Sequence, residues 1–223
     1  MLAQNLELVE QRIRAAAARC GRRREDIRLI SVTKKFPAQV LRDAYAVGLR
    51  DFGENYVQEF EEKSPALANL PDARYHLIGH LQTNKTKKAA ELFHTIQTVD
   101  SAKLARRLDG ALSEERQPLD VLIEVKLSEE AAKAGAAPED LPAVIEAVQA
   151  CRYLRLKGLM TMPPWSDDPE ITRPYFARLY ELAQKHHLTE LSMGMSHDLE
   201  AAIEEGATLV RVGRGLFGPR KKT

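Results

Sequence analysis

Eight short apolar runs, each followed by a stretch with helical patterning, constrain the fold more than any other feature of this sequence. The runs are rich in Val, Ile and Leu, as is typical of strands in a parallel sheet covered on both faces. They occupy residues 27–33, 50–53, 75–81, 94–100, 119–126, 154–160, 190–195 and 208–213. Eight such units in 223 residues predict an α/β fold, a single (β/α)8 barrel of the TIM type, with residues 1–223 forming one domain.

Helical periodicity fills the segments between these runs. An extra helix is predicted before the first strand, over residues 3–19, where Leu6, Val9 and Ile13 form one apolar stripe. The other predicted helices cover residues 37–46, the segment after residue 53, and residues 83–92, 101–114, 138–150, 169–186 and 196–206. Ser101 and Ser196 stand where a hydroxyl could cap the helix that follows.

An open, doubly wound sheet is the alternative to the barrel. Such a sheet would carry a glycine-rich phosphate-binding loop after its first strand. Here that position holds Lys34, Lys35, Phe36 and Pro37. The barrel is therefore the favoured prediction.

Charge and cysteine content exclude several classes of protein. The 33 Lys and Arg nearly cancel the 32 Asp and Glu, so nucleic acid or an acidic membrane is not expected as the main partner. Cys20 and Cys151 lack metal-ligand spacing and are interpreted as idle thiols in a reducing compartment. The charged amphipathic N-terminal segment is not a signal peptide, and no apolar run could span a bilayer. We expect a cytoplasmic protein.

No motif indicates a metal site or a hydrolytic triad. The sequence contains no HExxH motif and no set of carboxylates clustered as for a metal. The adjacent His186 and His187 end a predicted helix, where a cation suits the helix dipole. No bound metal is expected.

The first strand ends in a lysine pair, Lys34 and Lys35. A lysine at the carboxyl end of a buried strand is partly desolvated, and its neutral amine can attack an aldehyde. Two solvated lysines at a strand exit explain this stretch equally well when it is taken alone.

All strands of a parallel barrel open their carboxyl ends on one face, and that face carries the chemistry. We therefore expect the residues at the strand ends to lie together. They are Lys34, Glu54, Asn55, His80, Gln82, Asn84, Lys126, residues 160–162, Met195, Ser196 and residues 211–215.

The last two strand ends carry the features of a phosphate site. Barrels commonly bind phosphate between the loops after strands seven and eight and a helix N-terminus. Ser196 stands in the first loop, the glycine-rich residues 212–218 form the second, and Arg214 and Arg220 add positive charge. The alternative is that Ser196 is only a helix cap and the glycines only form turns. Combined with Lys34, the pattern predicts a phosphorylated aldehyde cofactor held as a Schiff base.

Five motifs, SVTKK, DFGENYVQE, HLIGHLQTNK, KGLM and MGMSHDLEAAIEEGATLVRVGRGLFGPR, appear in this order. They resemble the pyridoxal-phosphate homeostasis protein family, the stand-alone relatives of the alanine-racemase barrel domain. The resemblance covers about residues 5–220 and implies pyridoxal 5'-phosphate (PLP) as cofactor. It assigns the Schiff base to Lys34. It implies that the other cofactor-binding residues are Asn55, Met160, Ser196, Arg211, Gly213 and Arg214, with Ser196 and the backbone of 213–214 on the phosphate.

The resemblance places Arg211 opposite the pyridine nitrogen. Arginine does not give up its proton, so it donates to an unprotonated ring nitrogen and leaves the ring a weaker electron sink than an aspartate would. Related racemases add a second domain with a tyrosine acid/base, and we expect no such domain in this protein. We therefore expect a monomeric PLP carrier in vitamin B6 and amino-acid homeostasis, with little or no catalysis, that supplies PLP-requiring apoenzymes. A PLP-dependent racemase or lyase and a PLP-free sugar-phosphate barrel remain the alternatives.

Three departures from the family pattern concern details of the site. His80 replaces a Pro or Gly, Arg214 stands where a small hydroxyl residue is usual, and the basic tail lacks an aromatic end. Lys133 matches a lysine of the family's variable loop. It is interpreted as a solvated loop residue, with a transient second acceptor of the aldehyde as the alternative.

Overall fold

The eight strands of the protein close into a parallel barrel in sequence order, and β8 pairs back onto β1. The computed structural model describes residues 1–114, 117–128 and 134–219. The strands are β1 Arg28–Val32, β2 Asp51–Glu54, β3 Arg74–Leu77, β4 Thr95–Val99, β5 Leu119–Glu124, β6 Leu154–Met160, β7 Glu190–Met195 and β8 Leu209–Val212. The predicted (β/α)8 barrel is confirmed. The alternative of an open, doubly wound sheet is wrong, because β8 pairs with β1 and the sheet has no free edge.

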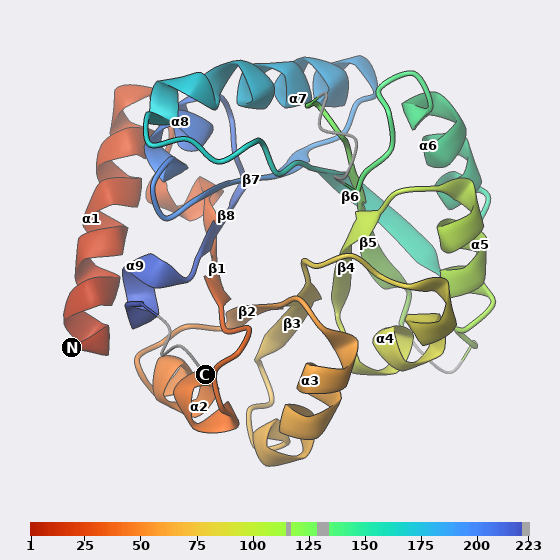
Figure 1. Cartoon of the computed structure of the whole chain (residues 1–223), viewed down its shortest axis with the longest axis horizontal. Coiled ribbons are helices and arrows are strands. Elements are labelled where there is room, and N and C mark those ends of the chain that lie inside the picture. The colour runs from red at the N-terminus through yellow and green to blue at the C-terminus, as the bar shows by residue number, and fades with distance from the viewer. Residues whose placement is uncertain (115–116, 129–133, 220–223) are drawn as a thin grey trace.

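Helices surround the barrel as an outer ring (Figure 1). They are α1 Leu2–Arg19, α2 Ala38–Ala46, α3 Val57–Lys63, α4 Thr86–Leu92, α5 Ala102–Asp109, α6 Leu141–Gln149, α7 Arg173–Lys185, α8 Leu199–Glu204 and α9 Arg214–Phe217. Short 3-10 turns lie at Arg24–Asp26, Ser64–Leu67, Thr83–Lys85 and Pro169–Ile171. The helices expected over 83–92 and 169–186 thus each begin with a separate 3-10 turn. The helix expected over 101–114 ends at Asp109, where Gly110 follows.

The extra N-terminal helix is confirmed as α1, which packs beside α8 and α9 (Figure 1). Its Val9 and Ile13 are buried in the core. Arg12 donates two hydrogen bonds, of 2.6 and 2.7 Å, to the carboxylate of Glu200 on α8. The side-chain amide of Asn5 donates to the carbonyl of Leu216 on α9 at 2.8 Å. The first helix is therefore fastened to the elements that follow β7 and β8.

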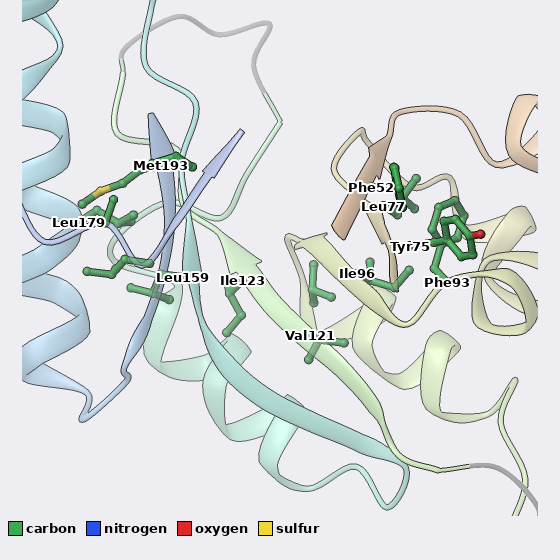
Figure 2. Close-up of a cluster of buried hydrophobic side chains, with 14 of the residues drawn as sticks. Phe52, Tyr75, Leu77, Phe93, Ile96, Val121, Ile123, Leu159, Leu179 and Met193 are labelled. Atoms are coloured by element: carbon green, nitrogen blue, oxygen red, sulfur yellow. The ribbon is translucent and has the colours of Figure 1, made fainter. Parts of the chain in front are cut away.

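The hydrophobic core lies between the sheet and the helices, where outward-facing strand residues meet helix residues (Figure 2). An aromatic cluster forms one side of it: the ring of Phe60 lies 4.6 Å from that of Tyr75 and 4.9 Å from that of Phe93. Burial of large apolar side chains of this kind contributes about 1.5–3 kcal/mol for each one. This layer fixes the strands, and with them the positions of the residues that follow each strand.

Candidate functional site

A cavity of about 460 Å³ opens at the carboxyl ends of the strands. It is lined by Val32, Lys34, Asn55, Ile78, Met162, Trp165, Met195, Ser196, His197, Arg211, Gly213, Arg214 and Gly215. Six of the seven predicted cofactor-binding residues thus surround one space. The volume lies in the range of small-molecule sites, and most of its wall is apolar with a few convergent polar groups.

Of the two lysines after β1, the half-buried Lys34 lines the cavity, whereas Lys35 is exposed. Lys35 adopts a left-handed backbone conformation, with φ of 63°, and its backbone N–H donates to the carboxylate of Glu59. Such a conformation is uncommon for a residue with a side chain and persists where its surroundings hold it. The turn therefore separates the two lysines and directs them into different environments.

A buried charged cluster lies beneath this turn. The hydroxyl of Thr33 donates to Glu54 at 2.7 Å. The ammonium of Lys63 donates to the same carboxylate at 3.0 and 3.2 Å, and to the carbonyl of Thr33 at 3.2 Å. Burial raises the pKa of Glu54, and the charge of Lys63 opposes that rise. The cluster holds the residue before Lys34 through both its hydroxyl and its carbonyl.

Asn55 follows β2, and its side-chain oxygen is buried without a hydrogen-bond partner among the residues that the structure describes. Its backbone lies directly against Gly79: a Cβ added to Gly79 would come within 2.3 Å of the Asn55 carbonyl oxygen. The glycine is therefore required for the close approach that places Asn55 on the cavity wall. An orphaned acceptor at a cavity indicates a place for a ligand's donor group.

Ser196 lies after β7 beside α9. Its hydroxyl accepts a hydrogen bond from the backbone N–H of Gly215 at 3.2 Å, and its carbonyl accepts one from Arg12 on α1 at 2.8 Å. Gly213 is the N-cap of α9, and the first N–H groups of a helix have no acceptor within it. The Ser196 hydroxyl and the start of α9, a helix that the sequence did not predict, thus meet at one end of the cavity.

The prediction that Ser196 caps the helix after β7 is wrong. The N-cap of α8 is Asp198, and the helix begins at Leu199. The carboxylate of Asp198 instead accepts the backbone N–H of Met195 at 2.6 Å, which closes a turn between β7 and α8. This turn moves the helix start two residues onward and leaves the Ser196 hydroxyl facing α9.

Arg211, on β8, is buried and lines the cavity. Its guanidinium donates to the hydroxyl of Ser192 at 2.6 Å and to the carbonyl of Thr161 at 2.9 Å. Burial lowers the pKa of Arg211 to about 10, and the charges of Asp198 and Glu124 oppose that fall. Arginine carries five N–H donors, so donors remain for a ligand in the cavity.

Trp165 and His197 line the cavity without having been predicted as site residues. Their rings lie 5.8 Å apart. The Nε2 atom of His197 is buried without a hydrogen-bond partner within the described part of the chain. Two features of the sequence could have pointed to them: Trp165 is its single tryptophan, and His197 directly follows Ser196.

Met160 is fully buried and is absent from the cavity wall, whereas Met162, two residues further on, forms part of it. Of the other strand-end residues, Thr161 is buried, and its hydroxyl donates to the carbonyl of Val125 at 2.9 Å. Gln82 and Asn84 are exposed and line neither this cavity nor the neighbouring one described next.

His80 and Lys126 line a neighbouring cavity of about 440 Å³. The two cavities share Met162, Trp165 and Met195. Glu124 also lines the second cavity, and burial raises its pKa to about 7. Lys133 and Arg220, together with the basic tail, lie outside the described residues.

Two further findings concern the described residues alone. They contain no group of three or more His, Cys, Asp or Glu side chains placed to hold a metal ion. Within the same ranges, every helix is too short or too polar to cross a membrane.

Comparison with known proteins defines the class to which this fold and site belong. The family model for the alanine racemase N-terminal domain matches residues 4–221. The chain is 48% identical over 221 residues to a pyridoxal phosphate homeostasis protein of Pseudomonas aeruginosa, covering 98% of this chain and 96% of that protein. It is 40% identical over 226 residues to the Escherichia coli K12 protein of the same name, covering 98% and 97%. The chain therefore belongs to the alanine racemase N-terminal domain family and, within it, to the pyridoxal phosphate homeostasis proteins.

Solved structures agree with this assignment. PipY of Synechococcus elongatus PCC7942, in a structure with PLP bound, superposes with a TM-score of 0.85 at 39% identity, over 98% of this chain and all of that chain. An alanine racemase of Clostridium difficile 630 superposes with a TM-score of 0.75 at 14% identity, over 98% of this chain and 58% of that chain. The second likeness concerns the fold alone.

Proposed function

We propose that this protein binds PLP in the cavity at the strand ends and acts in intracellular PLP (vitamin B6) and amino-acid homeostasis. The observation that carries the proposal is the meeting of Lys34, Arg211, Ser196 and the start of α9 around one cavity. An amine, a fixed cation and a cluster of anion-binding donors are the groups that an aldehyde, a pyridine nitrogen and a phosphate require. The orphaned Asn55 oxygen supplies an acceptor on the same wall.

In this proposal, Lys34 would hold the cofactor as a Schiff base, in which the amine nitrogen replaces the aldehyde oxygen and that oxygen is lost as water. The Ser196 hydroxyl and the backbone of Gly213 and Arg214 bind the phosphate, and Arg211 donates to the ring nitrogen. Met160 is fully buried and does not line the cavity, so the proposal assigns it no contact with the cofactor.

We propose a carrier rather than an enzyme because of Arg211. A buried guanidinium keeps its protons at neutral pH, so it donates a hydrogen bond to the ring nitrogen and does not protonate it. PLP supplies an electron sink when bound, and this arrangement weakens that sink. A racemase or lyase acting on a small amino acid is the second candidate, and it is favoured only by the fold shared with alanine racemases.

The remaining expectations belong to the same proposal. Residues 1–223 would form one PLP-binding domain of a cytoplasmic monomer. Its partners would be PLP and the apoenzymes that require it, with no role for nucleic acid. These points are tested by sedimentation of the purified protein and by transfer of PLP to an apoenzyme.

The test of the cofactor site is absorbance followed by peptide mapping. PLP added to the protein should give a visible absorbance band, and borohydride should then fix the label on Lys34. Lys34→Ala should lose the band, whereas Lys35→Ala, the matched control on the exposed neighbour, should keep it. A label on Lys35 or Lys133 would overturn the assignment. A protein that stays colourless would support a PLP-free barrel.

The test against catalysis is hydrogen exchange. An enzyme would exchange the α-hydrogen of an amino acid for deuterium at about 1 per second or faster, in the usual range of turnover numbers. The proposed carrier should show exchange far below that rate. Exchange at enzymatic rates that Lys34→Ala abolishes would establish the racemase or lyase instead.

A further inference from the structure

A chain of hydrogen bonds crosses the interior of the barrel from Arg211 to Asp51. The guanidinium of Arg211 donates to the hydroxyl of Ser192 at 2.6 Å, and that hydroxyl donates to the side-chain oxygen of Gln97 at 2.6 Å. The amide nitrogen of Gln97 lies 3.2 Å from Nδ1 of His76. Nε2 of His76 lies 2.9 Å from the carboxylate of Asp51. We call these five residues the interior relay.

The interior relay passes through the centre of the barrel. Gln97 is on β4 and Ser192 is on β7, and these strands are not neighbours in the closed sheet, so the bond between them crosses the interior. The Arg211 end lines the cofactor cavity. At the other end, Asp51 is the first residue of β2, and the side chain of Arg74, which is 53% exposed, lies 3.2 Å from it. The relay thus joins the cavity to the opposite face of the barrel.

All five members are buried, with exposed fractions from 0% for Gln97 and Ser192 to 7% for Asp51. Barrel interiors are usually filled by branched apolar side chains. Buried polar groups weaken a fold unless each has its partner, and a fully paired set instead fixes one arrangement of its members. The arrangement that this set fixes is that of Arg211.

The orientation of the Gln97 amide sets the direction of the bonds in the relay. Its oxygen accepts from the Ser192 hydroxyl, which leaves the amide nitrogen to donate to Nδ1 of His76. Nε2 of His76 then donates to the Asp51 carboxylate, so that each hydrogen points from Arg211 towards Asp51.

We propose that Ser192, Gln97 and His76 are positioning residues that hold the Arg211 guanidinium with its remaining donors towards the cavity. The ligand atom that faces Arg211 must then be a hydrogen-bond acceptor. The relay accepts one N–H and the Thr161 carbonyl accepts another, so the guanidinium cannot rotate without breaking a buried bond. The assignment rests on the proposed function for the identity of the ligand, but not for the geometry of the relay.

The first test removes one link. Ser192→Ala deletes the acceptor of Arg211, and Ser31→Ala is the matched control. Ser31 is equally buried, on β1, and its hydroxyl has no hydrogen-bond partner among the described residues. In PLP-free protein, the side-chain nitrogen NMR signals of Arg211 should broaden or shift in Ser192→Ala and stay unchanged in Ser31→Ala. PLP affinity should fall roughly tenfold in Ser192→Ala alone, the effect of one lost hydrogen bond to a charged group.

The second test reverses one link. Gln97→Glu keeps the size of the side chain but cannot donate to His76, so Nδ1 of His76 should gain a proton that nitrogen NMR detects. In the unmodified protein the same measurement should show Nδ1 bare and Nε2 protonated.

Three outcomes decide the matter. A proton on Nδ1 of His76 in the unmodified protein would overturn the inferred direction. Arg211 signals that respond alike to Ser192→Ala and Ser31→Ala would overturn the positioning role. A protein that binds no PLP but shows the expected Arg211 and His76 signals would refute the proposed function and leave the relay standing.

Discussion

Replacing Lys63 by Met should destabilise the protein far more than removing a surface lysine. Lys63 makes two hydrogen bonds to Glu54 and one to the Thr33 carbonyl, and both charged side chains are buried. Without Lys63, the Glu54 carboxylate keeps, among the residues that the structure describes, only the hydrogen bond from the Thr33 hydroxyl at 2.7 Å. Removal of one partner of a buried ion pair costs about 3–5 kcal/mol. For a chain of this size, that loss lowers the melting temperature by roughly 10 °C.

The matched control is Lys88→Met. Lys88 pairs with Glu61 at 3.1 Å and with Glu91 at 3.0 Å, but its side chain is 41% exposed. Exposed pairs contribute about 0–1 kcal/mol, so this variant should unfold close to the unmodified protein. Urea titration followed by circular dichroism gives the free energy of unfolding for both variants.

The dependence on pH provides a sharper test. The raised pKa of Glu54 means that burial favours its protonated form. Loss of the Lys63 charge raises that pKa further. The folded protein then loses more free energy of unfolding as the pH rises through the folded pKa of Glu54, because the carboxyl ionises without its partner. The destabilisation by Lys63→Met should therefore be large at about pH 8 and smaller at about pH 5. This account of the cluster would be refuted if Lys63→Met lost no more free energy of unfolding than Lys88→Met, or if its loss grew as the pH fell.

Three other changes probe the supports of the site. Arg12→Met removes the donor to the Ser196 carbonyl, so PLP affinity in an absorbance titration should fall several-fold although Arg12 lies outside the cavity wall; unchanged affinity would contradict the role of α1. Gly79→Ala places a methyl group against the backbone of Asn55, and PLP affinity should fall by roughly tenfold or more, with stability reduced by about 1–3 kcal/mol. Glu124→Gln should stabilise the protein in alkali, because a carboxyl whose folded pKa is raised to about 7 favours folding at acid pH and loses that contribution as the pH rises. The free energy of unfolding of Glu124→Gln should exceed that of the unmodified protein by roughly 3 kcal/mol at about pH 8, and the difference should vanish near pH 4. A difference that stays constant with pH in urea titrations would contradict this prediction.

The strand count, the barrel and the residues at the strand ends could be predicted from the sequence because each depends on local pattern. Apolar runs of strand length alternate with helical periodicity, and parallel closure then brings Lys34, Ser196 and Arg211 to one face. The family motifs added the identity of the cofactor. These inferences needed no knowledge of side-chain contacts.

The features that sequence reasoning missed depend on contacts between distant segments. Local pattern predicts that the hydroxyl of Ser196 caps the next helix, but Asp198 closes a turn there, and the hydroxyl instead accepts a hydrogen bond from Gly215 on α9. The interior relay joins residues as far apart as Gln97 and Ser192, whose polar character within apolar runs gave no hint of their pairing. Met160 and Met162 differ only in which neighbours surround them, which periodicity alone does not distinguish.

The fastening of α1 to the last described helix has a consequence for biosynthesis. Asn5 contacts Leu216, and Arg12 donates to the carbonyl of Ser196, so the end of the cavity at Ser196 and α9 is assembled from segments separated by nearly the whole length of the polypeptide. Contacts of such long range form late, because loop-closure entropy opposes them until the intervening chain is ordered. A ribosome-bound nascent chain that has emerged only as far as β7 would therefore lack the proposed phosphate-binding residues after β8 and should not retain PLP.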